Sequence, residues 1–297
     1  SIPITLSVAI LSAGTLIDSY NITSRLIAGG YLKDNAQSLY GMYLKYTTLI
    51  NMPITIISAL AVAVLPAIST AVALKDKQLV ANKINFAFRI SLLIVIPTAV
   101  GFSLLGKPIY ELLHLSDGYK IMIFGSVIVI FSALIQIQTT ILQGIGRLYA
   151  VIYYSVLGLI MKYIVNYILV AIPSVSIYGA IIGSVIGFGV PIVLNIVYML
   201  KTLRIKINLK AYIFKPLVSS IFMAVVVYVG YNILSYILGF IFKGYFNNAI
   251  SVLIAIALGM LAYFYAMVLN KGITNTELDT ILSKIKRFIP NKKNDTF

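Results

Sequence analysis

The stretch SIYGAIIGSVIGFGVPIVLNIVYML, residues 176–200, contains no Asp, Glu, Lys or Arg. A helix needs about 20 mostly apolar residues to cross a bilayer, so this stretch predicts a membrane span. Seven other mostly apolar runs along the chain are long enough to do the same, at residues 2–26, 43–72, 86–106, 121–142, 148–171, 213–240 and 248–270. The sequence therefore predicts an all-α integral membrane protein with about eight transmembrane helices.

The composition of the whole chain favours the same class. Hydrophobic residues make up 60% of the 297 positions and charged residues only 10%, whereas a soluble domain carries about 25% charged residues. Lipid must therefore be the solvent for most of the surface. Because the chain has no cysteine and one histidine, thiolate and multi-histidine metal sites are excluded, and no cofactor is expected. No GxSxG, Walker or HExxH signature occurs, so transport or scaffolding is favoured over an enzyme.

The positive charges predict the orientation in the membrane. Lys and Arg exceed Asp and Glu by 23 to 8. They lie mainly in short loops between the apolar runs, which indicates an orientation signal rather than a nucleic-acid partner. Loops on one side would carry sixteen of these cations and loops on the other side four. Because cation-rich loops stay in the cytoplasm, both ends of this chain are expected there.

Small and aromatic residues predict how the spans pack. Gly179, Gly183 and Gly187 recur at four-residue spacing, which lets another helix approach closely, either within this chain or in a dimer. Tyrosines near the outer ends of predicted spans are typical of an aromatic belt at the membrane interface. These are Tyr40, Tyr43, Tyr46, Tyr110 and Tyr119.

Residues 272–297 predict a basic amphipathic tail. Apolar residues recur on one helical face, with Lys and Arg between them. Such a helix either lies on the anionic inner leaflet or folds back onto the cytoplasmic ends of the spans. Membrane lipids are therefore an expected partner.

Four charged residues fall inside predicted spans, where each costs on the order of 2.5–3.5 kcal/mol at a helix centre. They are Asp18, Arg25, Lys45 and Lys162. At about 100° per residue, Asp18, Asn21 and Arg25 share one helix face. The second span contributes Lys45, Thr48 and Asn51 at three-residue intervals. Hydrocarbon would not tolerate such stripes, so they predict a polar cavity between helices.

Each of these residues also has a structural interpretation. Arg25 and Lys45 lie near span ends and could extend to the headgroups. Asp18 could pair with a neighbouring helix, and Lys162 could be a buried, hydrogen-bonded lysine. As a set, three cations and one carboxylate would give a cavity a net positive charge, which suits a phosphate. An exporter of cations would be expected to carry surplus carboxylates instead.

Several segments resemble the second lobe of a known exporter fold. They are SIPITLSVAILSAGTLIDSYNITSRL at 1–26, NMPITIISALAVAVLPAIS at 51–69, LVANKINFAFRISLLIVIPTAVGF at 79–102, TTILQGIGRLYAVIYYSVLGLIMKYIVNYILV at 139–170 and IPSVSIYGAIIGSVIG at 172–187. Together they resemble the stage V sporulation protein B branch of the multidrug/oligosaccharidyl-lipid/polysaccharide flippase superfamily. The resemblance implies two six-helix lobes around a cavity, followed by two further helices. Residues 1–200 would then be the second lobe, 201–271 the additional pair and 272–297 the tail, and the chain would be the C-terminal part of a longer protein.

The resemblance also implies a function. Its members move undecaprenyl-pyrophosphate-linked saccharides, such as the peptidoglycan precursor lipid II, across the bacterial cell membrane by alternating access. On this sequence Arg25 and Lys45 fit residues that grip the pyrophosphate, and Asp18 fits a gating or ion-coupling role, with Na⁺ or H⁺ as the coupling ion. A role in spore cortex synthesis is implied in the same way.

Two other functions remain open from the sequence. A cation-coupled multidrug antiporter of the same superfamily would carry its carboxylates in the lobe outside this chain. A non-transporting scaffold would recruit cell-wall enzymes through the basic tail.

Overall fold

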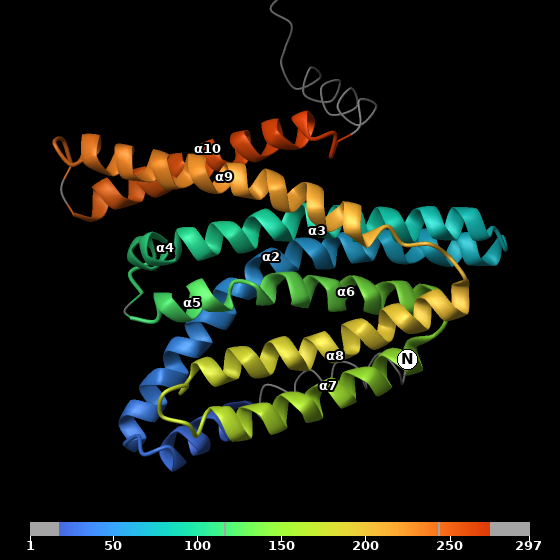
Figure 1. Cartoon of the computed structure of the whole chain (residues 1–297), viewed down its shortest axis with the longest axis horizontal. Helices are drawn as coiled ribbons and strands as arrows, with labels where there is room; N and C mark the ends of the chain where they lie inside the picture. The colour runs from blue at the N-terminus through green and yellow to red at the C-terminus, as the bar shows by residue number, and fades with distance from the viewer. Residues whose placement is uncertain (1–17, 116, 243, 274–297) are drawn as a thin grey trace, which may run out of the picture.

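The computed structural model describes residues 18–115, 117–242 and 244–273. Within these ranges the chain is helical between short turns (Figure 1). A helical segment at 18–28 comes first. The helices after it are α2 (Lys33–Ala73), α3 (Lys77–Leu104), α4 (Gly106–Leu112), α5 (Tyr119–Gly125), α6 (Ile128–Gly144), α7 (Leu148–Leu169), α8 (Tyr178–Leu203), α9 (Leu209–Leu238) and α10 (Tyr245–Leu269). Most of the predicted span 2–26 and nearly all of the predicted tail lie outside the described residues.

The prediction of an all-helical membrane protein is confirmed. Six helices of the described part are long and apolar enough to cross a membrane, and α5 with α6, which meet at 52°, would make a seventh as one broken span. Each corresponds to one of the predicted runs. The predicted starts of the second and third spans are late, because α2 begins at Lys33 and α3 at Lys77. Asp76 explains why α3 begins at Lys77. Its carboxylate accepts a hydrogen bond from the Leu79 backbone N–H at 2.9 Å and caps the helix.

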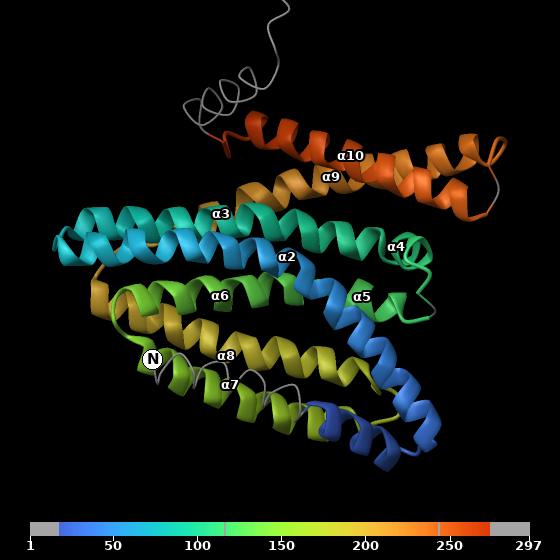
Figure 2. The ribbon, with the colours of Figure 1, turned by 180° about the vertical axis from the view of Figure 1, so that it is seen from behind.

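The helices form a flattened stack, seen from both sides in Figures 1 and 2. The α9–α10 pair lies at one edge against α3, and α3 packs on α2 and α6. The α7–α8 pair lies at the other edge, where α8 contacts α6. The helix α2 changes direction along its length (Figure 2). Pro53, which lies inside α2, removes a backbone hydrogen bond and is the physical cause expected for such a bend.

Glycines hold α7 and α8 together, which confirms the prediction of close helix packing within the chain. A Cβ at Gly187 would lie 2.6 Å from Cβ of Lys162, and one at Gly179 would lie 2.8 Å from the backbone N of Val170. A Cβ at Gly158 on α7 would lie 2.9 Å from the Pro191 ring on α8. The two backbones therefore touch at positions where any larger residue would separate them.

The aromatic belt predicted from the tyrosines is wrong for three of its members. Tyr43 is only 5% exposed, and Tyr46 and Tyr110 are each 2% exposed. The hydroxyl of Tyr46 donates to the backbone carbonyl of Gly125 at 2.9 Å. Because the partner for this hydroxyl lies inside the helix bundle, the ring turns inward and does not reach the membrane interface.

Candidate functional site

The segment 18–28 lies along α7 through its polar residues. The Nδ2 atom of Asn21 donates to the Tyr163 carbonyl at 3.2 Å, and Nε of Arg25 donates to the Tyr167 carbonyl at 2.9 Å. Asp18, on the same face, contacts the side chain of an α7 residue as described next. The polar stripe predicted on the first span therefore faces a neighbouring helix and not lipid.

Asp18 and Lys162 form an ion pair between this segment and α7. The Lys162 ammonium donates to the Asp18 carboxylate, and each side chain is 14% exposed. Nδ2 of Asn166, one turn further along α7, donates to Oδ1 of Asp18 at 3.3 Å. Asn166 is fully buried, and a Cβ at Gly183 would collide with its Oδ1. The glycine face of α8 thus leaves the room that the partners of Asp18 occupy.

The ion pair lies at the wall of a cavity between helices. We call this the ion-pair cavity; its volume is about 210 Å³. Segment 18–28, α2, α6, α7 and α8 all contribute to its wall. Its lining residues are Asp18, Tyr40, Tyr43, Leu44, Tyr46, Thr47, Ile50, Asn51, Ile128, Ser132, Lys162, Ser184 and Phe188.

The structure brings together half of the predicted site residues. Asp18, Asn51 and Lys162 line the ion-pair cavity. Asn21 is 2% exposed and does not line it. The described lining residues contain one lysine and one aspartate as their only charged side chains, so this wall is electrically balanced and does not carry the predicted positive excess.

Arg25 and Lys45 lie apart from the cavity wall. The guanidinium carbon of Arg25 is 3.9 Å from the centroid of the Tyr167 ring, in a cation–π contact. Its hydrogen bond to the Tyr167 carbonyl holds it in this position. Lys45 is half-buried on α2 and is not among the lining residues. The structure therefore does not bring the two cations assigned to pyrophosphate binding into the cavity with Asp18.

The aromatic side of the cavity was missed by sequence reasoning. The rings of Tyr40 and Tyr43 are stacked with centroids 6.3 Å apart, and the Tyr43 hydroxyl is 3.4 Å from Oγ of Ser184. Tyr40, Tyr43, Thr47 and Asn51 are spaced i, i+3, i+7, i+11 along α2. This helical spacing, ending at an asparagine inside a span, was the available signal for a stripe facing a cavity.

Paired ionisable side chains that lie among membrane spans and face a cavity are typical of transporters. Residues 1–247 match the family model described as Lipid II flippase MurJ. Because the match covers more than half of the chain, the protein belongs to the MurJ lipid II flippase family. This membership confirms the predicted superfamily, and it agrees with the expectation of a transporter and not an enzyme.

Two curated relatives extend over much of the chain. The sequence is 24% identical over 258 residues to Lipid II flippase MurJ of Bacillus subtilis (strain 168), an alignment covering 84% of this chain and 46% of that protein. It is also 24% identical over 296 residues to Uncharacterized membrane protein YabM of the same strain, covering 99% of this chain and 54% of that protein. The chain thus spans about half the length of the curated relatives it matches. The sporulation branch stays a finer prediction that these matches do not support.

Proposed function

We propose that the protein moves a lipid-linked saccharide pyrophosphate of the lipid II class across the bacterial cell membrane, with the ion-pair cavity as this chain's part of the path. The observation that carries the proposal is the Asp18–Lys162 pair, held among membrane-spanning helices and open to a cavity. Family membership supplies the substrate class. The spore cortex remains one setting in which such a precursor would be needed.

The ion pair suggests how an anionic headgroup acts on the cavity. A pyrophosphate that enters competes with Asp18 for the ammonium of Lys162, because both offer charge-assisted hydrogen bonds. The carboxylate released from the pair then needs a cation, since an isolated charge at this depth is costly. Na⁺ or H⁺ at Asp18 would satisfy that need and would couple ion entry to headgroup entry.

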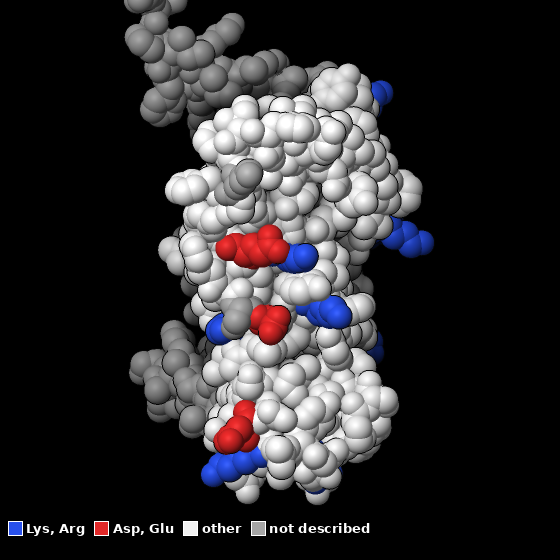
Figure 3. Space-filling view, turned by 90° about the vertical axis from the view of Figure 1, so that its left-hand side faces the viewer, with Lys and Arg blue, Asp and Glu red and all other residues white. Residues whose placement is uncertain are grey.

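The distribution of charge supports an orientation for this path. The connections at 74–76, 145–147 and 204–208 lie at one end of the stack, and those at 29–32 and 170–177 at the other (Figure 1). The second end carries acidic side chains and only a few cations on a largely uncharged surface (Figure 3). The first end is cation-rich, so we place it, with both chain ends, in the cytoplasm.

Transport of lipid II in vesicles that contain the intact protein tests the proposal. Lys162→Gln and Asp18→Asn should each lower the rate of headgroup exposure at least tenfold. The double variant removes both charges and should regain stability but not transport, because neither the anion nor the coupling ion has its partner. Normal transport by a stable double variant would assign the pair a structural role and overturn the proposal.

A matched control separates this effect from loss of charge in general. Lys107→Gln changes a lysine at the opposite side of the bundle, where the side chain is 62% exposed, and transport should be unchanged. Deleting residues 272–297 should also leave turnover intact. Loss of all activity on that deletion would favour the scaffold function. Export of organic cations in place of lipid II would favour the antiporter.

A further inference from the structure

A second cavity lies at the cation-rich end, between α3, α9 and the end of α10. We call it the basic cavity; its volume is about 270 Å³. Its lining residues are Arg89, Leu93, Asn208, Ala211, Tyr212, Lys215, Pro216, Met267, Lys271 and Gly272. Three of these are cations, each from a different part of the chain, and no Asp or Glu is among the described residues that line it.

The wall of the basic cavity is fixed by one asparagine of α3. Nδ2 of Asn85 donates to the Lys206 carbonyl at 3.1 Å, and its Oδ1 accepts from the Asn208 backbone N–H at 3.3 Å. The Tyr212 hydroxyl donates to the same Oδ1 at 3.1 Å. These contacts hold the α8–α9 connection and the first turn of α9 against α3. The cavity is therefore a built feature of the fold.

Two of the cations, Lys215 and Arg89, are oriented by backbone carbonyls just after the end of α10. Nζ of Lys215 donates to the Lys271 carbonyl at 2.8 Å, and Nη2 of Arg89 donates to the Gly272 carbonyl at 2.8 Å. A lysine has three N–H donors, so this bond leaves Lys215 able to bind an anion as well. The first turn of α9 adds to this, because α9 has no side-chain N-cap and uncapped backbone N–H groups favour anions.

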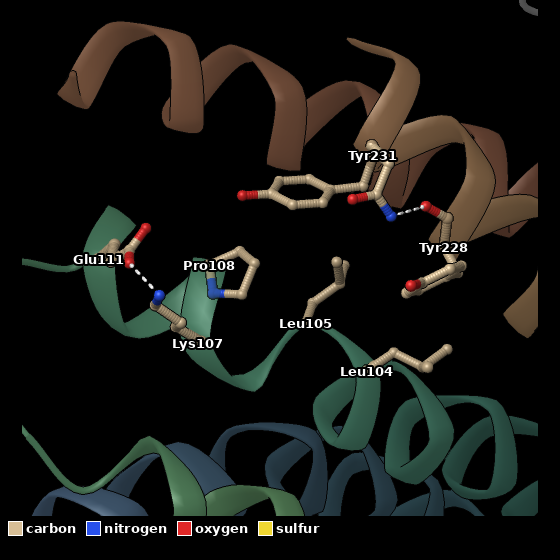
Figure 4. A pocket seen from close by; sticks show the side chains of 8 residues that line it. Leu104, Leu105, Lys107, Pro108, Glu111, Tyr228 and Tyr231 are labelled. Carbon is tan, nitrogen blue, oxygen red and sulfur yellow. Dashed lines mark hydrogen bonds and ion pairs between the residues drawn. The ribbon is translucent and has the colours of Figure 1, made fainter. Parts of the chain in front are cut away.

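The opposite end of the same helix pair has a cavity of different character. It lies between α4 and α9, with a volume of about 260 Å³ (Figure 4). We call it the outer cavity. There, Lys107 pairs with Glu111 on the same helix, at 3.8 Å. Lys107 at the outer cavity thus has an acidic partner on its own helix, whereas the described residues that line the basic cavity offer no carboxylate to Lys215 or Lys271.

The surroundings of the basic cavity suit a lipid. Next to Lys215 on α9, Ile213 is 42%, Phe214 65% and Leu217 41% exposed. Lys215 lies near the start of α9, where a span meets the headgroups, and the exposed apolar side chains beside it can contact the adjoining part of the acyl chains. Basic pockets between membrane helices at the cytoplasmic side bind anionic headgroups. A free phosphate would use the cations but not the exposed apolar surface.

We propose that the basic cavity binds the phosphate of an anionic phospholipid such as phosphatidylglycerol, with its acyl chains along the exposed face of α9. Lys215 and Lys271 contact the phosphate, and Arg89 and the first turn of α9 complete the site. This site is separate from the ion-pair cavity and does not rest on the proposed transport function. The bound lipid would join α9 and α10 to α3.

Native mass spectrometry of the intact protein tests this site with short-chain phosphatidylglycerol and phosphatidylcholine as probes. The unmodified protein should prefer phosphatidylglycerol by about tenfold or more, since each cation near the headgroup contributes about 1 kcal/mol. Lys215→Gln with Lys271→Gln should abolish that preference. Lys75→Gln with Lys201→Gln, which removes two exposed cations of the same end, should leave it unchanged. Equal losses in both pairs would overturn the site.

Two further measurements distinguish the alternatives. If Lys215 and Lys271 only stabilise the end of α10, the unmodified protein will melt at the same temperature in either lipid, and the proposal fails. If inorganic phosphate at equal concentration binds as tightly as phosphatidylglycerol, the site takes phosphate and not lipid. Lys215→Arg with Lys271→Arg keeps both charges and should retain the preference, which provides a folded variant if the glutamine pair does not fold.

Discussion

The ion-pair cavity and the basic cavity differ in whether a carboxylate of the chain balances their cations. In the first, the ammonium of Lys162 is balanced by Asp18 within the chain, and each side chain is only 14% exposed. In the second, Lys215 lies near the start of α9 and Lys271 just after α10, with no carboxylate among the described lining residues. Hydrocarbon supplies no counter-charge, so a cation deep in the bundle needs an internal partner. Water and headgroups supply one at the boundary.

The largest expected effect comes from breaking the deep pair from one side. Lys162→Met leaves the Asp18 carboxylate uncompensated and should lower stability by about 3 kcal/mol, as for other pairs that lose one partner. Adding Asp18→Asn removes the remaining charge and should recover most of the loss. Thermal unfolding in detergent measures both variants. If the double variant is as unstable as the single one, charge balance does not govern this site.

The next largest loss of stability is expected from filling the space at Gly183 that Asn166, a partner of Asp18, occupies. Gly183→Ala places a methyl group against Oδ1 of Asn166 and should cost about 1–3 kcal/mol through overpacking. Gly230→Ala is the matched control, because its Cβ would meet only Leu258 at an ordinary 3.5 Å. That change should be neutral or stabilise α9 by up to about 1 kcal/mol. Similar melting temperatures for the two variants would contradict the close contact of α7 with α8.

A smaller loss of stability is expected from changing Arg25, which contacts Tyr167 on α7 away from the ion-pair cavity. Arg25→Gln removes the cation–π contact with Tyr167 and should lower stability by about 1 kcal/mol. Arg25→Lys keeps the charge without the planar stacking and should recover only part of it. Transport should fall much less than in Lys162→Gln. Abolished transport at unchanged stability would instead assign Arg25 to substrate binding.

A comparably small effect is expected from the acidic side chain that caps α3 at the cation-rich end. Asp76→Ala removes the cap of α3 and should cost about 1 kcal/mol. Asp34→Ala is the comparison, since Asp34 lies in the first turn of α2, where the N-cap Leu32 makes no side-chain hydrogen bond. Its effect should stay within about 0.5 kcal/mol. Melting curves of the two variants check the difference.

The fold was more predictable from the sequence than the site, for a physical reason. Membrane spans depend on the hydropathy of about 20 neighbouring residues, so the runs at 43–72 and 213–240 predict α2 and α9. The partner of Asp18 is 144 positions away, and no local pattern identifies it. The direction of Arg25 depends on the Tyr167 carbonyl, and the inward turn of Tyr46 depends on the Gly125 carbonyl. Local sequence patterns therefore do not give the surroundings of either residue.

The glycine contacts of α7 with α8 have a mechanical consequence. At Gly158 and Gly187 the two backbones approach directly, and the side-chain atoms nearest to them belong to the rigid Pro191 ring and the base of Lys162, so few rotamer changes can relax this contact. The hairpin can swing only as one rod, and Lys162 travels with it. Any widening of the ion-pair cavity must then come from α2 on the other wall, because Pro53 weakens the middle of that helix.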